Sequence, residues 1–305
     1  MNLATREAYG NTLVELKENE NVVVLEADLG HATKSLKFKE VCSERFFNMG
    51  IAEADMIGTA AGLSTCGKVP FASTFSVFAT GRAFDQVRNS VCYPNLNVKI
   101  VGTHAGITVG EDGGTHQAIE DIAIMRSLPN MSIIVPSDDV EARAAVLAAA
   151  EIKGPMYLRM ARVASPTYHA EDYKFEFGKG EIVCDGDDVT IVATGLMVVK
   201  ALKAAEKLKE EGISARVVNI HTIKPLDEEL IISSAKKTSK VVTVEEATIL
   251  GGLGSAVCEV LAENYPVPVK RIGVEDKFGK SGKPDLLLEE YGLTTERIIE
   301  EVKKI

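Results

Sequence analysis

The chain has 305 residues, 46% of them hydrophobic and 26% charged, a composition typical of a globular protein with one large or two medium-sized domains. Its formal net charge of -10 argues against nonspecific nucleic-acid binding, which needs a basic surface to displace counterions from phosphates. The sequence has no apolar run of membrane-spanning length, no signal-peptide core and no zinc-ligand pattern among its cysteines, so we expect a cytoplasmic protein without membrane, nucleic-acid or metal contacts.

In the first half of the chain, short β-rich runs alternate with segments whose apolar residues recur at helical spacing. The expected strands are 22–25, 98–101, 132–135 and 156–158, and the expected helices are 4–18, 51–64 and 138–150. Asp138 is placed to cap the last of these helices. This alternation predicts a parallel sheet covered by helices.

Residues 166–182 lose this periodicity and gather proline, glycine and charge, which is typical of a linker. A second α/β pattern follows, with expected strands at 189–194, 215–219, 240–244 and 269–272 and a helix at 197–211. We therefore predict an α/β protein with a first domain at 1–165 and a smaller second domain at 183–305.

The densest polar motif is GEDGGTH, from Gly110 to His116, between a predicted strand and a helix. In open α/β sheets, ligands bind beyond the carboxyl ends of strands. The glycines allow a close approach of the backbone to a ligand, and Asp112 and His116 could bind hydroxyls or transfer protons. An ordinary surface turn has a similar composition, and spacing alone leaves both interpretations open.

Two further candidates lie near predicted strand and helix ends. His104 follows the strand 98–101, where it is either a structural hydrogen-bonding residue or part of a site. Glu53 opens a helix of small and apolar residues, where it could be partly buried and share a proton with a ligand. It could also be a solvent-facing carboxylate that interacts with the helix dipole.

Aromatic and basic pairs complete the set of candidates. Phe75 and Phe78 could form a wall for a flat heterocycle or belong to the core. Arg159 and Arg162 flank a strand end and could hold a phosphate, or be solvated surface charges.

The sequence GGLG at 251–254 follows a predicted strand and resembles part of a dinucleotide fingerprint, but Val257 replaces its last glycine. Close packing between helix and strand explains these glycines without a nucleotide.

Four motifs together resemble the pyrimidine-binding half of transketolases. They are GIAE at 50–53, STF at 73–75, GEDGGTHQAIE at 110–120 and RSLPN at 126–130. The similarity runs through nearly the whole chain and includes FGKSG at 278–282. It implies a thiamine-diphosphate pyrimidine-binding domain built on a parallel sheet, followed by a smaller α/β transketolase C-terminal domain.

The resemblance also implies roles in binding the cofactor. Glu53 matches the glutamate that binds the aminopyrimidine ring and favours its imino tautomer, which makes it a catalytic residue. Phe75 and Phe78 match aromatic residues that pack on this ring, and Asp28 matches an acid near the cofactor.

Substrate contacts follow from the same resemblance. Asp112 and His116 would contact the sugar, with His116 near the reacting carbon as a second catalytic residue. His104 and Arg162 match positions that hold the terminal phosphate of the substrate.

The sequence departs from the family pattern at three places. Gly114 stands where many members have proline, and Gly81 stands where some have a third aromatic residue. Ala52 and Ala54 replace the arginine and histidine beside the glutamate of long-chain transketolases, as in related families.

In the family, the diphosphate and Mg²⁺ bind to a GDG motif in an N-terminal domain. This sequence does not contain that motif. The resemblance therefore implies a separate N-terminal transketolase subunit that carries the magnesium ligands. Two copies of each subunit would form a heterotetramer, in which the second domain described here would mainly serve assembly.

The implied activity is transketolase activity, the reversible transfer of a two-carbon ketol unit from xylulose 5-phosphate to ribose 5-phosphate in the pentose phosphate pathway. The alternatives are a deoxyxylulose-phosphate-synthase-like subunit, an oxo acid dehydrogenase beta-like subunit and a non-catalytic paralogue. Glu111, followed by Thr115, His116 and Gln117, favours transketolase.

Overall fold

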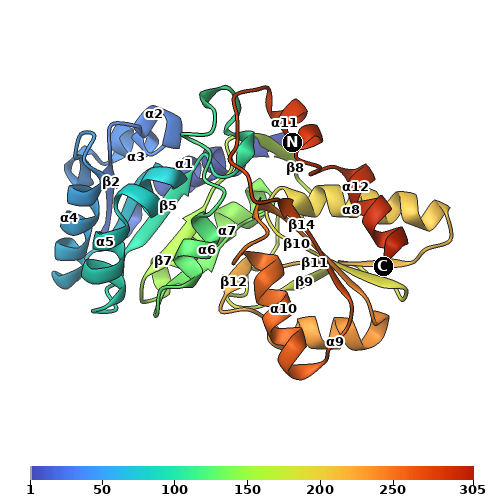
Figure 1. The fold of residues 1–305 in the computed structure, drawn as a ribbon. Helices are drawn as coiled ribbons and strands as arrows, with labels where there is room; N and C mark the ends of the chain where they lie inside the picture. Colours follow the sequence, from blue (N-terminus) through green and yellow to red (C-terminus); the bar gives the residue numbers. More distant parts are fainter. Residues whose placement is uncertain (1) are drawn as a thin grey trace.

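The computed structural model describes residues 2–305, so Met1, with which the first predicted domain begins, lies outside the described residues. Two sheets lie side by side (Figure 1), the first built mainly from the blue-to-green half of the chain and the second from the yellow-to-red half. Within the described residues, no helix is long and apolar enough to cross a membrane.

The first sheet has seven strands in the order β12-β6-β7-β5-β4-β2-β3, and only β12 is antiparallel to its neighbour. The strands are β2 (Val22–Glu26), β3 (Phe46–Asn48), β4 (Val69–Phe75), β5 (Lys99–Thr103), β6 (Ser132–Ile134), β7 (Met156–Arg159) and β12 (Thr222–Lys224). The central strands are buried along their length, as expected where helices cover both faces of a parallel sheet.

The described part of the first half also contains seven α-helices: α1 (Thr5–Glu15), α2 (Gly30–Thr33), α3 (Leu36–Val41), α4 (Glu53–Thr65), α5 (Phe84–Gln86), α6 (Asp121–Arg126) and α7 (Asp139–Glu151). Asp138 caps α7, because its side chain accepts a hydrogen bond from the N–H of Glu141 at 2.9 Å. The predicted cap is thereby confirmed.

The second sheet has the order β14-β13-β10-β11-β9, with only β9 antiparallel. Its strands are β9 (Glu181–Cys184), β10 (Val189–Ala193), β11 (Ala215–Asn219), β13 (Val241–Thr248) and β14 (Val269–Val274). The accompanying helices are α8 (Met197–Glu210), α9 (Glu228–Thr238), α10 (Leu253–Asn264), α11 (Pro284–Glu290) and α12 (Thr295–Lys304). A two-stranded sheet joins β1 (Asn2–Ala4) to β8 (Ala164–Pro166). The predicted α/β class is confirmed.

Three strands of the first sheet, β3, β4 and β12, were not predicted from the sequence. Pro70 lies inside β4, although proline argues against a central strand. The three-residue strand β12 comes from the second half of the chain and pairs with β6 at the edge of the first sheet. Residues 167–180 contain neither helix nor strand, and the domain division at 166–182 stays a prediction.

A buried arginine connects the two sheets. Arg159, at the end of β7, donates its Nε to Asp121 Oδ2 at 2.7 Å, and its Nη2 donates to the carbonyl of Glu246 in β13 at 2.9 Å. The hydroxyl of Tyr157 donates to the same Asp121 oxygen at 2.7 Å. Arg159 is therefore neither a surface charge nor a phosphate ligand, contrary to both interpretations of the sequence.

Replacement of Asp121 should destabilise the whole protein. Asp121→Asn keeps the shape of the side chain but removes the charge that balances a buried guanidinium, so we expect the free energy of unfolding to fall by about 3–5 kcal/mol. Urea unfolding measures the change. Glu296→Gln is the control, because Glu296 pairs with Lys207 at the exposed surface and should have little effect. Equal effects of the two variants would contradict the prediction.

Candidate active site

The carboxyl ends of the parallel strands gather the predicted site residues at one edge of the first sheet. Asp28 follows β2, Phe75 ends β4, His104 follows β5 and Arg162 follows β7. Because these neighbouring strands run parallel, residues far apart in the sequence lie beside one another at this edge.

Four predicted rings form one cluster at this edge. The rings of Phe75 and His104 stack with centroids 3.9 Å apart, and those of Phe75 and Phe78 lie 5.9 Å apart at an interplanar angle of 11°. His116 approaches Phe78 edge-on at 5.4 Å. Phe75 is buried, whereas Phe78 is partly exposed. Phe78 therefore offers the more accessible aromatic surface to a ligand.

Glu53 lies at the start of α4 and is only 1% exposed, so the interpretation as a solvent-facing carboxylate is wrong. Arg82 Nη1 donates to Glu53 Oε2 at 2.7 Å, and the guanidinium also lies over the Phe78 ring at 4.3 Å. The sequence analysis did not select Arg82, because an arginine after Gly81 gives no local sign of a buried partner. The guanidinium of Arg82 thus links the Glu53 carboxylate to the Phe78 ring.

Asp28 lies beside the motif that contains Glu53. Its Oδ1 accepts a hydrogen bond from Asn48 Nδ2 at 3.3 Å, and Asn48 Oδ1 accepts one from the N–H of Gly50 at 2.8 Å. The backbone of Asp28 is left-handed, with φ of 61°, a conformation that aspartate adopts more readily than most residues. This geometry brings the loop after β2 to the beginning of α4.

His104 is held as a neutral imidazole. Arg6 Nη1 lies 3.0 Å from its Nε2, and Thr103 Oγ1 lies 2.9 Å from its Nδ1. Arginine has only donors, so Nε2 accepts, and the ring proton lies on Nδ1 and is donated to Thr103. Burial, followed by the charges of Arg6 and Arg162, lowers the pKa of His104 to about 3.

Arg6 contacts the candidate site, and the sequence analysis did not select it, because a charged residue in the first turn of a helix usually faces solvent. It also donates to the carbonyl of Ala32 at 2.9 Å, and its buried Nε has no hydrogen-bond partner among residues 2–305. Together with Lys34 and Arg162, it surrounds His104 with positive charge. We call Arg6, Lys34, His104 and Arg162 the cationic wall. It suits an anionic group of a ligand.

The GEDGGTH loop is attached to the cationic wall. Arg162 Nη1 donates to the carbonyl of Val109 and pairs with Glu111 at 3.3 Å. Gly110 and Gly113 have φ of 87° and 79°, a left-handed backbone that favours glycine. Asp112 is exposed at the end of this turn.

The second half of the chain supports the same loop from the other side. The carbonyl of Glu111 accepts a hydrogen bond from Ser281 Oγ at 2.6 Å, and Gln117 Nε2 donates to the carbonyl of Lys280 at 2.9 Å. A Cβ atom on Gly114 would lie 2.6 Å from the carbonyl oxygen of Gly279. The departure at Gly114 therefore follows from a close approach of two backbones.

Comparison with known proteins agrees with this geometry. Residues 1–167 match the family described as transketolase, pyrimidine binding domain, and residues 178–298 match transketolase, C-terminal domain. The chain belongs to the transketolase family. Transketolases are thiamine-diphosphate-dependent enzymes that transfer ketol units.

Several transketolase relatives match almost the full length of the chain. A putative transketolase C-terminal section from Methanocaldococcus jannaschii is 54% identical and is matched over 98% of this chain and 96% of its own. The 6-deoxy-6-sulfo-D-fructose transketolase subunit SqwH from Clostridium sp. is 46% identical, over 96% of this chain and 92% of its own. A solved structure described as "Split gene transketolase, inactive beta4 tetramer" is 56% identical with a TM-score of 0.93, over 99% of this chain and 98% of its own.

The glycines at 251–254 serve packing in this transketolase chain. The buried carboxylate of Glu245 accepts hydrogen bonds from the N–H groups of Leu253 and Gly254, each at 2.8 Å. Burial raises the pKa of Glu245 to about 7. Because this side chain fills the start of α10, where a dinucleotide phosphate would bind, the structure agrees with the packing interpretation.

Because His104 is neutral, we expect its NMR signal to stay constant over the pH range in which an ordinary histidine titrates. The lowered pKa keeps the ring uncharged from pH 8 to pH 5, so its ¹³Cε1 shift should stay constant, with the signal assigned by loss in His104→Gln. The unfolded chain, with its ordinary pKa of 6.5, binds a proton that the folded chain does not. His104 therefore lowers stability as the pH falls below 6.5 toward 3. A titration midpoint between pH 5 and pH 8 would contradict this assignment.

Proposed function

We propose that this chain is the C-terminal subunit of a split transketolase and transfers a two-carbon ketol unit between sugar phosphates together with an N-terminal subunit. The observation that carries the proposal is the buried carboxylate of Glu53, which Arg82 links to the Phe78 ring at the sheet edge that also holds the cationic wall.

The residues at this edge fit the pyrimidine ring of thiamine diphosphate. Phe78 offers an accessible flat surface, and Glu53 offers a carboxylate in a water-poor setting. Arg82 binds Oε2 of Glu53, while Oε1 accepts no hydrogen bond from residues 2–305 and can bind a ring nitrogen. Thiamine diphosphate, when bound, supplies the electron sink for cleavage of a bond next to a carbonyl. Asp28 would support the loop on the other side of Glu53.

The substrate would extend from the Phe75 and Phe78 rings to the cationic wall. His116 lies against Phe78 and Asp112 is exposed nearby in the sequence, so we assign these two residues to the sugar and its reacting end. Arg162 and His104 would bind the terminal anion, with Arg6 as an additional donor. Because His104 is neutral, its role is orientation and hydrogen bonding, while the guanidinium groups supply the charge.

A second polypeptide is part of this proposal. Relatives that match nearly the full length of the chain are described as a C-terminal section, as a subunit and as a split-gene protein. We propose that the partner binds the diphosphate and Mg²⁺, and that two copies of each subunit form a heterotetramer in the cytoplasm.

Two classes of sugar are candidate substrates. Xylulose 5-phosphate and ribose 5-phosphate, the pentose phosphate pathway pair, fit the cationic wall through their phosphate groups. A sulfonated sugar fits as a second candidate, because guanidinium groups also bind a sulfonate, and one relative is described as a 6-deoxy-6-sulfo-D-fructose transketolase subunit.

Glu53→Gln should abolish ketol transfer. The assay couples xylulose 5-phosphate and ribose 5-phosphate with thiamine diphosphate and Mg²⁺, for this chain alone and with its N-terminal subunit. We expect activity only in the mixture, and a loss of about 10²–10⁴-fold in Glu53→Gln, which cannot exchange the proton. Asp55→Asn is the control, because Asp55 is an exposed carboxylate in the same helical turn. An inactive mixture that forms a complex would favour another thiamine-dependent reaction or a non-catalytic paralogue.

Arg162→Gln should weaken binding of the anionic end of the substrate. Loss of a charge-assisted hydrogen bond of about 1.5–3 kcal/mol predicts a KM about 10- to 100-fold higher for phosphorylated acceptors. The KM for unphosphorylated acceptors such as glycolaldehyde should change much less. Arg143→Gln, which removes an exposed arginine paired with Glu15, is the control. An equal rise in KM for both acceptor types would indicate a displaced loop and contradict anion binding by Arg162.

A further inference from the structure

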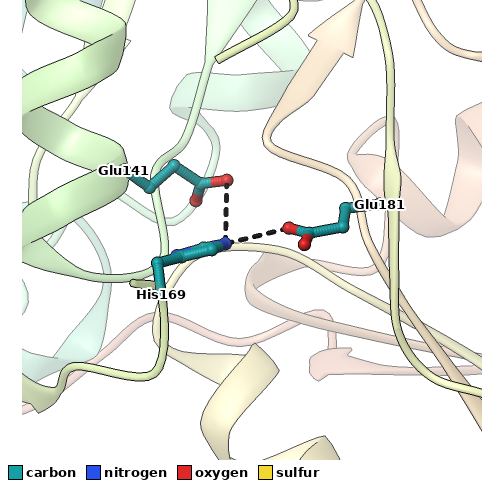
Figure 2. Close-up of side chains that lie close together, drawn as sticks. All are labelled: Glu141, His169 and Glu181. Carbon is teal, nitrogen blue, oxygen red and sulfur yellow. Dashed lines mark hydrogen bonds and ion pairs between the residues drawn. The ribbon is translucent and has the colours of Figure 1, made fainter. Parts of the chain in front are cut away.

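A polar cluster lies at the junction of the two sheets and plays no part in the site described above. Glu141 comes from α7, His169 from the segment that connects the halves, and Glu181 from β9 (Figure 2). The Nε2 atom of His169 lies 2.9 Å from Glu181 Oε2 and 4.0 Å from Glu141 Oε1. These three atoms all lie within 4.8 Å of one another.

Asp138 and two tyrosine rings fix the orientation of the His169 imidazole. Its Nδ1 lies 2.9 Å from Asp138 Oδ2, which also accepts hydrogen bonds from the N–H groups of Tyr168 and His169, each at 3.0 Å. The rings of Tyr168 and Tyr173 lie against the imidazole, each with its centroid 4.1 Å away. A carboxylate on one ring nitrogen that directs the other nitrogen toward acidic ligands is the usual outer shell of a metal-bound histidine.

The cluster has an excess of negative charge in a buried setting. The side chains of Asp138 and Glu141 are 0% exposed and that of Glu181 is 39% exposed. Even a doubly protonated His169 offsets only one of these three carboxylates. No lysine or arginine among residues 2–305 forms an ion pair with any of them. Hydrogen bonds from Ser137, Tyr173 and Asn219 offset part of the cost of burying Glu141. A divalent cation would supply the counter-charge that these neutral donors do not provide.

Asn219 gives an independent indication of a missing partner. Its side chain is completely buried, and its Nδ2 donates to Glu141 Oε1 at 2.8 Å. Its carbonyl oxygen Oδ1 has no hydrogen-bond partner among the described residues. A half-turn of the amide would place this oxygen where Nδ2 now contacts Glu141 Oε1, and a cation bound there would satisfy it.

We propose that Glu141, His169 and Glu181 bind a divalent first-row metal ion, such as zinc or manganese, with Asn219 as a fourth ligand. Ligand atoms about 2.1 Å from a tetrahedral ion lie roughly 3.4 Å from one another, and the two distances from His169 Nε2 lie on either side of this value. One nitrogen and several oxygens suit this class of ions.

This site would be structural. Its ligands come from α7, the connecting segment and the second sheet, so the ion would fix the position of one half of the chain relative to the other. Glu181 also lines a surface cavity with Tyr173, Lys179 and His221, which gives an ion access from solvent.

Titration of the full chain with metal ions tests the proposal. After dialysis against a chelator, Zn²⁺ and Mn²⁺ are titrated separately by calorimetry, and the thermal unfolding midpoint is measured with and without each ion. We expect one ion per chain and a higher midpoint with at least one of them. In Glu181→Gln, whose partly exposed side chain can be changed without loss of folding, affinity should fall at least about tenfold, as for loss of one ligand interaction.

The control is Glu176→Gln, because Glu176 is an exposed carboxylate that lines the same cavity but lies outside the cluster. It should bind the ion as the wild-type chain does. His169→Gln, tested for folding by circular dichroism, should bind least. If the wild-type chain binds neither ion, or if Glu181→Gln and Glu176→Gln bind equally well, the proposal is overturned, and a proton on His169 is then what bridges the carboxylates.

Discussion

The guanidinium of Arg159 is the contact on which both the junction of the sheets and the shape of the candidate active site depend. It binds Asp121 at the start of α6, the carbonyl of Ala118 beside the GEDGGTH loop, and the carbonyl of Glu246 in the second sheet. Because all three acceptors surround one buried cation, the loop cannot move away from either sheet without exposing an unpaired charge in a low-dielectric interior.

The second half of the chain contributes contacts to the candidate active site as well as to any assembly. The side chain of Glu246 accepts a hydrogen bond from the N–H of Thr108 at 2.8 Å, and it fills the space that a Cβ atom on Gly106 would need. Ser281 and Lys280 hold the loop at its other end. A loop of glycines has little rigidity of its own, so these contacts supply the order that the proposed role of the loop in substrate binding requires.

Local signals in the sequence predicted the regular elements, and contacts distant in sequence explain what it missed. The capped helix α7 and the strands around it have clear periodicity, whereas Pro70 in β4 contradicts the strand that contains it. Glu53 was ambiguous because its burial depends on Arg82, 29 residues away. Arg6 was missed because its partner His104 lies 98 residues along the chain. The sequence alone does not show whether a single charged side chain will contact solvent, a partner residue or a ligand.

The electrostatics of the cationic wall have a consequence for specificity. Arg6 and Arg162 keep their charge while they hold His104 neutral, so the wall presents fixed positive charge and one polar ring at any pH well above 3. Under the proposed assignment, such a surface would recognise the charge and the tetrahedral shape of an anion, properties that phosphate and sulfonate share. Discrimination between sugars therefore has to come from groups that contact hydroxyls, which in this chain are Asp112 and His116 under the proposed assignment. The proposed assignment therefore separates the recognition of the anion, by the cationic wall, from the discrimination between sugars, by the contacts between that wall and the cofactor.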